Sequence, residues 1–140
     1  MREKIIREKR LVEETVKELN KKLIKNKHTQ DEIVAMSKYI YDIYSGMENI
    51  LKIYLKTKGK EIPSSITWHR DLLEISHSAG IISREILEKL QELLGFRHIF
   101  AHGYAVRLRE SRVKDLCEET LDVWLKFVRE IEQFSEIDTE

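Results

Sequence analysis

The sequence predicts an all-α fold, an up-down antiparallel bundle of four to five helices. Of its 140 residues, 41% are hydrophobic and 36% are charged, with one proline and five glycines. This composition is typical of a soluble helical protein rather than of a sheet or a disordered chain. Apolar residues recur at helical spacing, and a helix with one apolar stripe needs neighbours to cover it. We expect a single helical domain over residues 1–140, and short connections favour antiparallel neighbours.

Periodicity and a helix-start motif predict the first two helices. Apolar residues at helical spacing from Ile5 to Ile24 predict a helix through the first two dozen residues, with lysines on its other face. Residues 29–32 have the S/T-x-x-E form, in which threonine and glutamate bond the free amides of a helix start. A second, central helix should begin there and run for about seven turns before Gly59.

A loop and a short helix should follow. Residues 58–65 form the only clear loop, because Gly59 and Pro63 interrupt helices and serines compete with helical hydrogen bonds. Apolar residues after Thr67 predict a third helix that ends near Gly80.

Two more helices complete the predicted bundle. Ser83 should cap a fourth helix that runs to Leu94, and Gly95 should break it. Helical spacing from about Arg112 to Phe134 predicts a long final helix.

The charges cancel overall but are unevenly distributed. The 25 basic and 25 acidic residues argue against a protein that coats nucleic acid. Residues 97–114, however, carry five basic side chains and one acidic, whereas residues 115–140 carry nine acidic and two basic. A local basic patch of this kind can bind a few phosphates.

The single cysteine and the lengths of the apolar runs indicate where in the cell the protein is expected. Cys117 alone excludes an intramolecular disulfide, and its amphipathic surroundings predict a small core residue. No apolar run approaches the roughly 20 residues of a membrane span, and the charged start lacks the apolar region of a signal peptide. We expect a cytoplasmic protein without membrane contact.

Residues 96–104 contain most of the candidate catalytic side chains of the sequence. Arg97, His98, His102 and Tyr104 lie within eight residues. In metal-independent RNA cleavage the 2′-hydroxyl attacks the neighbouring phosphorus. Histidine suits the two proton transfers, because its pKa lies near neutrality. Arginine suits the charge of the phosphorane, because its planar fork donates to two phosphoryl oxygens and stays protonated.

A single regular helix would not bring Arg97 and His102 together. Positions five apart on a helix point about 140° away from each other. Gly95 and Gly103 allow breaks in the backbone on either side. Alternatively, a two-fold dimer would gather both pairs around one cleft.

The pattern Arg97-x4-His102-x-Tyr104 resembles the R-x4-6-H signature of HEPN-domain ribonucleases, in the R-x4-H-x-Y form typical of HepT-like toxins. The order of elements is similar too, with two long helices, a Pro-containing loop, residues 68–73, the motif and a long final helix. The resemblance implies a homodimeric helical endoribonuclease without metal or cofactor. Its cleft would hold Arg97 and His102 from each protomer, with RNA as the substrate.

The resemblance also implies roles for two neighbours. His98 stands where the family has a polar residue, and it either supplies a second imidazole or orients His102. Tyr104 matches the tyrosine that a cognate nucleotidyltransferase antitoxin, of the MNT type, modifies with AMP in similar toxins. A bulky anionic adduct there would exclude and repel RNA.

Each of these residues also has a structural interpretation. Arg97 would form a surface salt bridge, for example with Glu92, and Tyr104 would cap the core. His98 and His102, four apart, have the spacing of a metal pair, but a third ligand at suitable spacing is missing nearby.

The flanking residues have two interpretations as well. Arg107, Arg109 and Arg112 either contact an RNA backbone or form solvated surface. Phe96 and Phe100 are expected to anchor the motif to the core rather than to stack on bases. His69 and His77 are interpreted as helix-surface or interface residues. The alternatives to a nuclease are a non-catalytic helical module that pairs with a nucleotidyltransferase, and a plain dimeric bundle.

Overall fold

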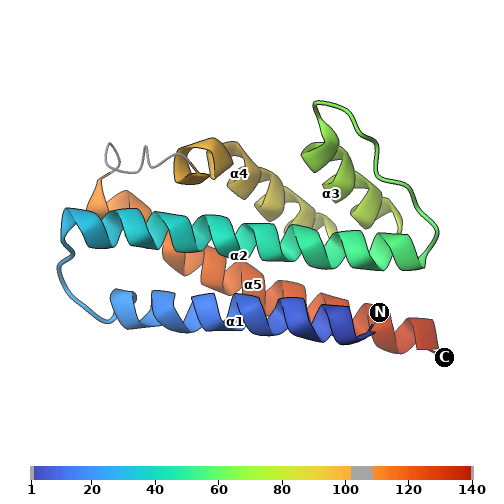
Figure 1. Cartoon of the computed structure of the whole chain (residues 1–140), viewed down its shortest axis with the longest axis horizontal. Helices are drawn as coiled ribbons and strands as arrows, with labels where there is room; N and C mark the ends of the chain where they lie inside the picture. The colour runs from blue at the N-terminus through green and yellow to red at the C-terminus, as the bar shows by residue number, and fades with distance from the viewer. Residues whose placement is uncertain (1, 102–108, 140) are drawn as a thin grey trace.

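The computed structural model describes residues 2–101 and 109–139, with side chains up to residue 135 (Figure 1). The helices in chain order are α1 (Arg2–Leu23), α2 (Gln30–Thr57), α3 (Trp68–Ser78), α4 (Arg84–Ala101) and α5 (Glu110–Thr139). These described ranges contain five α-helices and no strand, which confirms the predicted all-α fold.

Helix α2 is the centre of the bundle. It contacts each of the other four helices: α1 lies along one side of it, α3 and α4 along another, and α5 behind it (Figure 1). α1 runs antiparallel to α2, and α4 runs antiparallel to α5 (Figure 1). The core accordingly centres on α2, where Ile40, Ile43, Met47, Leu51 and Leu55 are all fully buried.

The predicted helix starts are confirmed by their hydrogen bonds. Thr29 Oγ1 accepts from the Glu32 amide at 3.1 Å, and Glu32 Oε1 accepts from the Thr29 amide at 3.0 Å. Ser83 Oγ accepts from the Ile86 amide at 3.2 Å and caps α4. These short-range bonds satisfy amides that have no partner inside the helix, which is why the sequence alone located both starts.

The prediction that Gly95 breaks the fourth helix is wrong. α4 passes through Gly95 and ends at Ala101. A glycine inside a helix costs only about 1 kcal/mol relative to alanine. Burial of Leu93 before it and of Phe100 after it outweighs that cost, because each fully buried side chain contributes about 1.5–3 kcal/mol. The final helix is also longer than predicted, beginning at Glu110.

Candidate active site around Arg97

Arg97 lies near the C-terminal end of α4, and its side chain faces α2. Its guanidinium Nη2 donates a long hydrogen bond, 3.4 Å, to the hydroxyl of Tyr41, and its Cζ lies 5.3 Å from the centroid of the Tyr41 ring. The half-buried Arg97 therefore rests on an aromatic face, a favourable cation–π geometry. Its Nε is buried and has no hydrogen-bond partner among the described residues.

The alternative salt bridge between Arg97 and Glu92 does not form in the described structure. Glu92 lies 3.9 Å from Lys89 Nζ instead. Within the described residues, Arg97 contacts the hydroxyl and the ring of Tyr41 and forms no ion pair with a carboxylate. Such a guanidinium can still bind an anion.

Next to Arg97, α2 presents two tyrosines and a glutamate on one face. Tyr41, Tyr44 and Glu48 are spaced three and four residues apart, so their side chains follow one another along the helix. Tyr44 donates to Glu48 Oε2 at 2.5 Å, and both residues are buried. Burial, and then the Glu48 charge, raise the pKa of Tyr44 well above its usual value, while the positive charge of Arg97 acts in the opposite direction.

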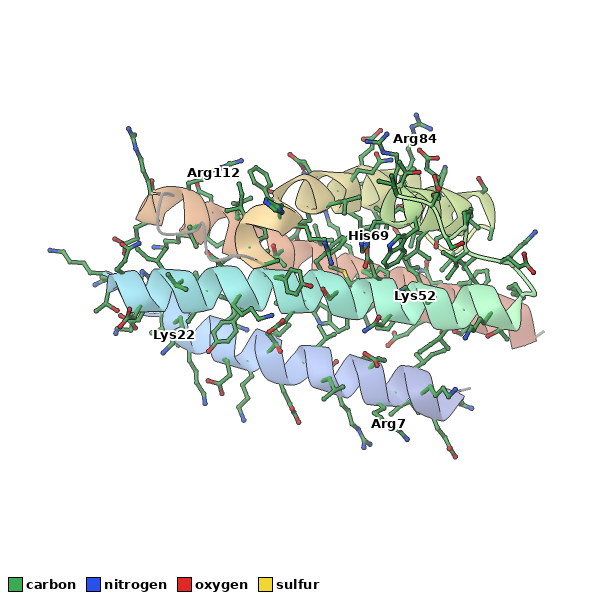
Figure 2. The ribbon with its side chains drawn as sticks, turned by 45° about the horizontal axis from the view of Figure 1, so that its top comes forward. Arg7, Lys22, Lys52, His69, Arg84 and Arg112 are labelled. Carbon is green, nitrogen blue, oxygen red and sulfur yellow. The ribbon has the colours of Figure 1, made fainter. Side chains whose placement is uncertain are left out.

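His69, interpreted from the sequence as a helix-surface or interface residue, lies at the contact between α3 and α2. Its side chain is only 18% exposed, and its Nδ1 lies 2.6 Å from Glu48 Oε2. The ring stacks on Trp68 with centroids 3.6 Å apart, and Lys52 Nζ lies 4.2 Å from the Trp68 ring centroid. Figure 2 shows His69 between its own helix, α3, and α2. Sequence reasoning missed this pair, because Glu48 and His69 are on different helices.

The residues of the predicted motif that are described lie on different faces of α4. His98 is exposed, while the adjacent Arg97 is half-buried, as expected for consecutive helical positions about 100° apart. Phe100 is 3% exposed and its ring centroid lies 5.9 Å from that of Phe96, which confirms that these two residues anchor the motif. Because α4 stays helical to Ala101, Gly95 provides no break that would reorient Arg97.

Four predicted positions, His102, Gly103, Tyr104 and Arg107, lie outside the described residues. Of the other two arginines, Arg109 is exposed just before α5, and Arg112 is exposed on its first turn, where Figure 2 labels it. Arg112 Cζ lies 5.2 Å from the Phe96 ring centroid. Both side chains are therefore accessible to an anionic ligand.

The start of α5 is tied to the connection between α1 and α2. Glu110 Oε1 accepts from the backbone amide of His28 and lies 2.8 Å from its ring Nδ1, while His28 Nε2 lies 2.7 Å from the carbonyl oxygen of Lys22. The hydrogen bonds from His28 lower the pKa of Glu110 below its usual value. This contact joins the start of α5 to the connection between α1 and α2, and nothing in the sequence pattern predicted it.

Two hollows lie near these helices. One of about 560 Å³ lies between α3 and α4, next to the turn that precedes Arg97. Its lining residues are Arg70, Glu74, Gln91, Leu94 and Gly95. Another of about 810 Å³ lies between α1, α2 and α5, away from Arg97, and its wall is mainly apolar, with Ile5, Ile50 and Phe127. Only the first adjoins the candidate site.

Residues 35–137 match the family model described as HepT-like protein. The chain belongs to the HepT-like family. The matched range begins in α2 and reaches the last turn of α5, so this HepT-like protein carries Arg97 and the R-x4-H-x-Y positions inside the family region. α1 lies outside the match. No curated protein and no solved structure matched the chain.

Over residues 2–101 and 109–139 of this HepT-like protein, no group of three His, Cys, Asp or Glu side chains is arranged to hold a metal ion. Within the same ranges, each helix is too short or too polar to cross a bilayer.

Proposed function

We propose that this HepT-like protein is a metal-independent endoribonuclease toxin of a HepT/MNT-type toxin–antitoxin system. The observation that carries the proposal is the environment of Arg97. Its guanidinium rests on the phenol of Tyr41 and has no carboxylate partner among the described residues. An arginine held in this way keeps its charge and its donors for phosphoryl oxygens.

In the proposed reaction Arg97 stabilises the negative charge of the phosphorane. His102 acts as general base or general acid, and His98 supplies a second imidazole or orients His102. The 2′-oxygen bonds to phosphorus, the bond to the 5′-oxygen breaks, and the products are a 2′,3′-cyclic phosphate and a 5′-hydroxyl. A homodimer would place Arg97 and His102 of both protomers around one cleft, where Arg107, Arg109 and Arg112 contact the RNA backbone.

The proposal includes a means of control. A cognate nucleotidyltransferase antitoxin would transfer AMP to Tyr104, which stands two residues after His102. The adduct would add negative charge beside the cleft and repel the RNA backbone.

The test is cleavage of single-stranded RNA by the full chain in EDTA, with analysis of the new termini. Arg97→Ala should reduce the rate by about 10²- to 10³-fold, as expected for loss of one group that stabilises the transition-state charge. Arg97→Lys keeps the positive charge but loses the planar guanidinium that donates two parallel hydrogen bonds. Its cleavage rate should therefore lie between the rates of the unmodified chain and of Arg97→Ala. His102→Ala should cost about 10²- to 10⁴-fold.

Arg84→Ala is the matched control. Arg84 is exposed at the other end of the same helix, where its Nε lies 3.5 Å from Glu88 Oε1. This variant should cleave RNA at the rate of the unmodified chain. Cleavage that depends on added divalent metal would contradict the mechanism. Binding of a nucleotidyltransferase without any RNA cleavage, and without growth arrest on expression, would favour the non-catalytic module.

A further inference from the structure

The hollow of about 810 Å³ between α1, α2 and α5, here called the apolar groove, has the size of a small-molecule site. Such sites have volumes of about 300–1,000 Å³ and mainly apolar walls with a few polar groups. The apolar groove lies at the end of the bundle where α1 begins and α2 and α5 end (Figure 1). Arg97 is not among its lining residues, so the groove needs an explanation other than RNA cleavage.

The floor of the apolar groove reaches the core of the protein. Four of its lining side chains are at most 7% exposed, namely Ile50 of α2 and Trp124, Phe127 and Ile131 of α5. On the α1 side, the apolar side chain of Ile6 is 42% exposed. Covering this surface with an apolar chain would remove it from water, which favours binding.

The polar residues of the apolar groove have an excess of positive charge. Its described lining residues include three basic side chains, Arg2, Lys9 and Lys58, and one acidic side chain, Glu132. Lys9 Nζ lies 3.2 Å from Glu132 Oε1, so these two charges compensate each other. The other two basic side chains make the groove positive. Positive charge beside an apolar floor is complementary to an amphipathic anion.

The ion pair between Lys9 and Glu132 also limits the width of a ligand. It connects α1 to α5, which both line the groove. A helix with its side chains is about 10–12 Å across, so a partner helix could lie between α1 and α5 only if the pair broke and α1 moved. An acyl chain is only one methylene wide and needs no such movement.

We propose that the apolar groove binds a long-chain fatty acid. The acyl chain covers Trp124 and Phe127, and its burial supplies most of the affinity. The carboxylate accepts charge-assisted hydrogen bonds from Arg2 and Lys58. This site is separate from the proposed ribonuclease function. One of its walls is α1, which lies outside the family match at residues 35–137, so the groove depends on a segment that the family model does not describe.

The test is a titration of the full chain with tetradecanoate, followed by the fluorescence of Trp124. The sequence has two tryptophans, so Trp68→Phe leaves Trp124 as the single reporter. The signal should saturate at one ligand per chain, below the concentration at which tetradecanoate forms micelles. Dodecanoate should bind about tenfold more weakly, because two methylenes fewer are buried. Tetradecyltrimethylammonium has the same chain length and the opposite charge, so it should show no saturable binding in this range.

Ile6→Glu and Leu11→Glu are matched variants. Both replace an exposed apolar residue of α1 by the same acid, but Ile6 lines the apolar groove and Leu11, 52% exposed, does not. Ile6→Glu should weaken tetradecanoate binding at least tenfold, and Leu11→Glu should leave it unchanged. The double variant Arg2→Gln, Lys58→Gln should also weaken it at least tenfold.

Thermal melting gives a second measurement. A ligand that binds the folded chain raises Tm as its concentration increases. Tetradecanoate should therefore raise the Tm of Leu11→Glu and of the unmodified chain, but not that of Ile6→Glu. Circular dichroism without ligand should show the same helix content in all of these variants, because the substituted side chains are exposed or at the rim.

Several results would overturn the inference. Fluorescence that changes only once micelles form, equal binding by Ile6→Glu and Leu11→Glu, or a cationic surfactant that binds as tightly as tetradecanoate would each do so. If sedimentation velocity shows a dimer that Ile6→Glu converts to a monomer, and tetradecanoate does not bind, a second copy covers the groove instead. RNA cleavage by the unmodified chain and its loss in Arg97→Ala are measured separately, so the proposed function can stand when this inference fails.

Discussion

The contact between α1 and α2 depends on the absence of a side chain at Gly46. An ideal Cβ at that position would lie well inside 3.0 Å of Val12 Cγ2 and 3.6 Å from Val12 Cβ. Val12 is 3% exposed, and a valine in a helix strongly prefers one rotamer, so its methyl group has nowhere to move. Gly46→Ala must therefore push the two helices apart.

Two opposing contributions determine how much Gly46→Ala changes the free energy of unfolding. In a helix interior, replacing glycine by alanine stabilises the helix by about 1 kcal/mol. Overpacking of a well-filled core costs about 1–3 kcal/mol, and the rigid Val12 side chain favours the upper end of that range. The net loss in the free energy of unfolding should be about 2 kcal/mol. Urea unfolding followed by circular dichroism measures it directly.

A double-mutant cycle gives the decisive control. Val12→Ala alone removes two methyl groups and should cost about 1.6 kcal/mol, at about 0.8 kcal/mol for each. In the Val12→Ala variant the methyl group that the new Cβ would meet is absent, so adding Gly46→Ala should increase stability. A Gly46→Ala variant that is as stable as the unmodified chain, or an effect of equal size and sign in both backgrounds, would refute the reasoning.

Three other substitutions test local features of the fold. Gly95→Ala should raise the free energy of unfolding by about 1 kcal/mol in thermal melts, because α4 is helical there and nothing lies within 4 Å of the added Cβ; a loss of stability would mean that the helix is broken at that point. Thr29→Ala should cost about 1 kcal/mol in urea unfolding through loss of the capping box, and an unchanged midpoint would contradict that role. Glu110 has a pKa below its usual value, so its stabilising contribution is complete above the pKa of the unfolded chain and is lost as pH falls through the lowered folded value. Glu110→Gln should therefore flatten the acid side of the stability-against-pH curve, and an unaltered acid side would show that its bonds to His28 contribute nothing.

The sequence by itself determined most of the helices, because the interactions that define a helix act over a few residues. The Thr29–Glu32 capping box and the Ser83 cap join residues three apart, and apolar stripes reveal which face of each helix is buried. The R-x4-H-x-Y pattern is equally local, and it pointed to the family that the match over residues 35–137 shows. Gly95 is the exception, because its local preference was outweighed by burial on both sides of it.

Only the tertiary structure decided which residues of different helices meet. Tyr41 and Arg97 are 56 residues apart, Glu48 and His69 are 21 apart, and His28 and Glu110 are 82 apart. No periodic pattern specifies which residues of two packed helices will meet, because side-chain packing of the whole bundle sets the axial position and rotation of each helix. For that reason the sequence could select Arg97 and His102 as candidate residues, whereas the contacts of Arg97 with Tyr41 and of His69 with Glu48 appeared only when the helices were assembled.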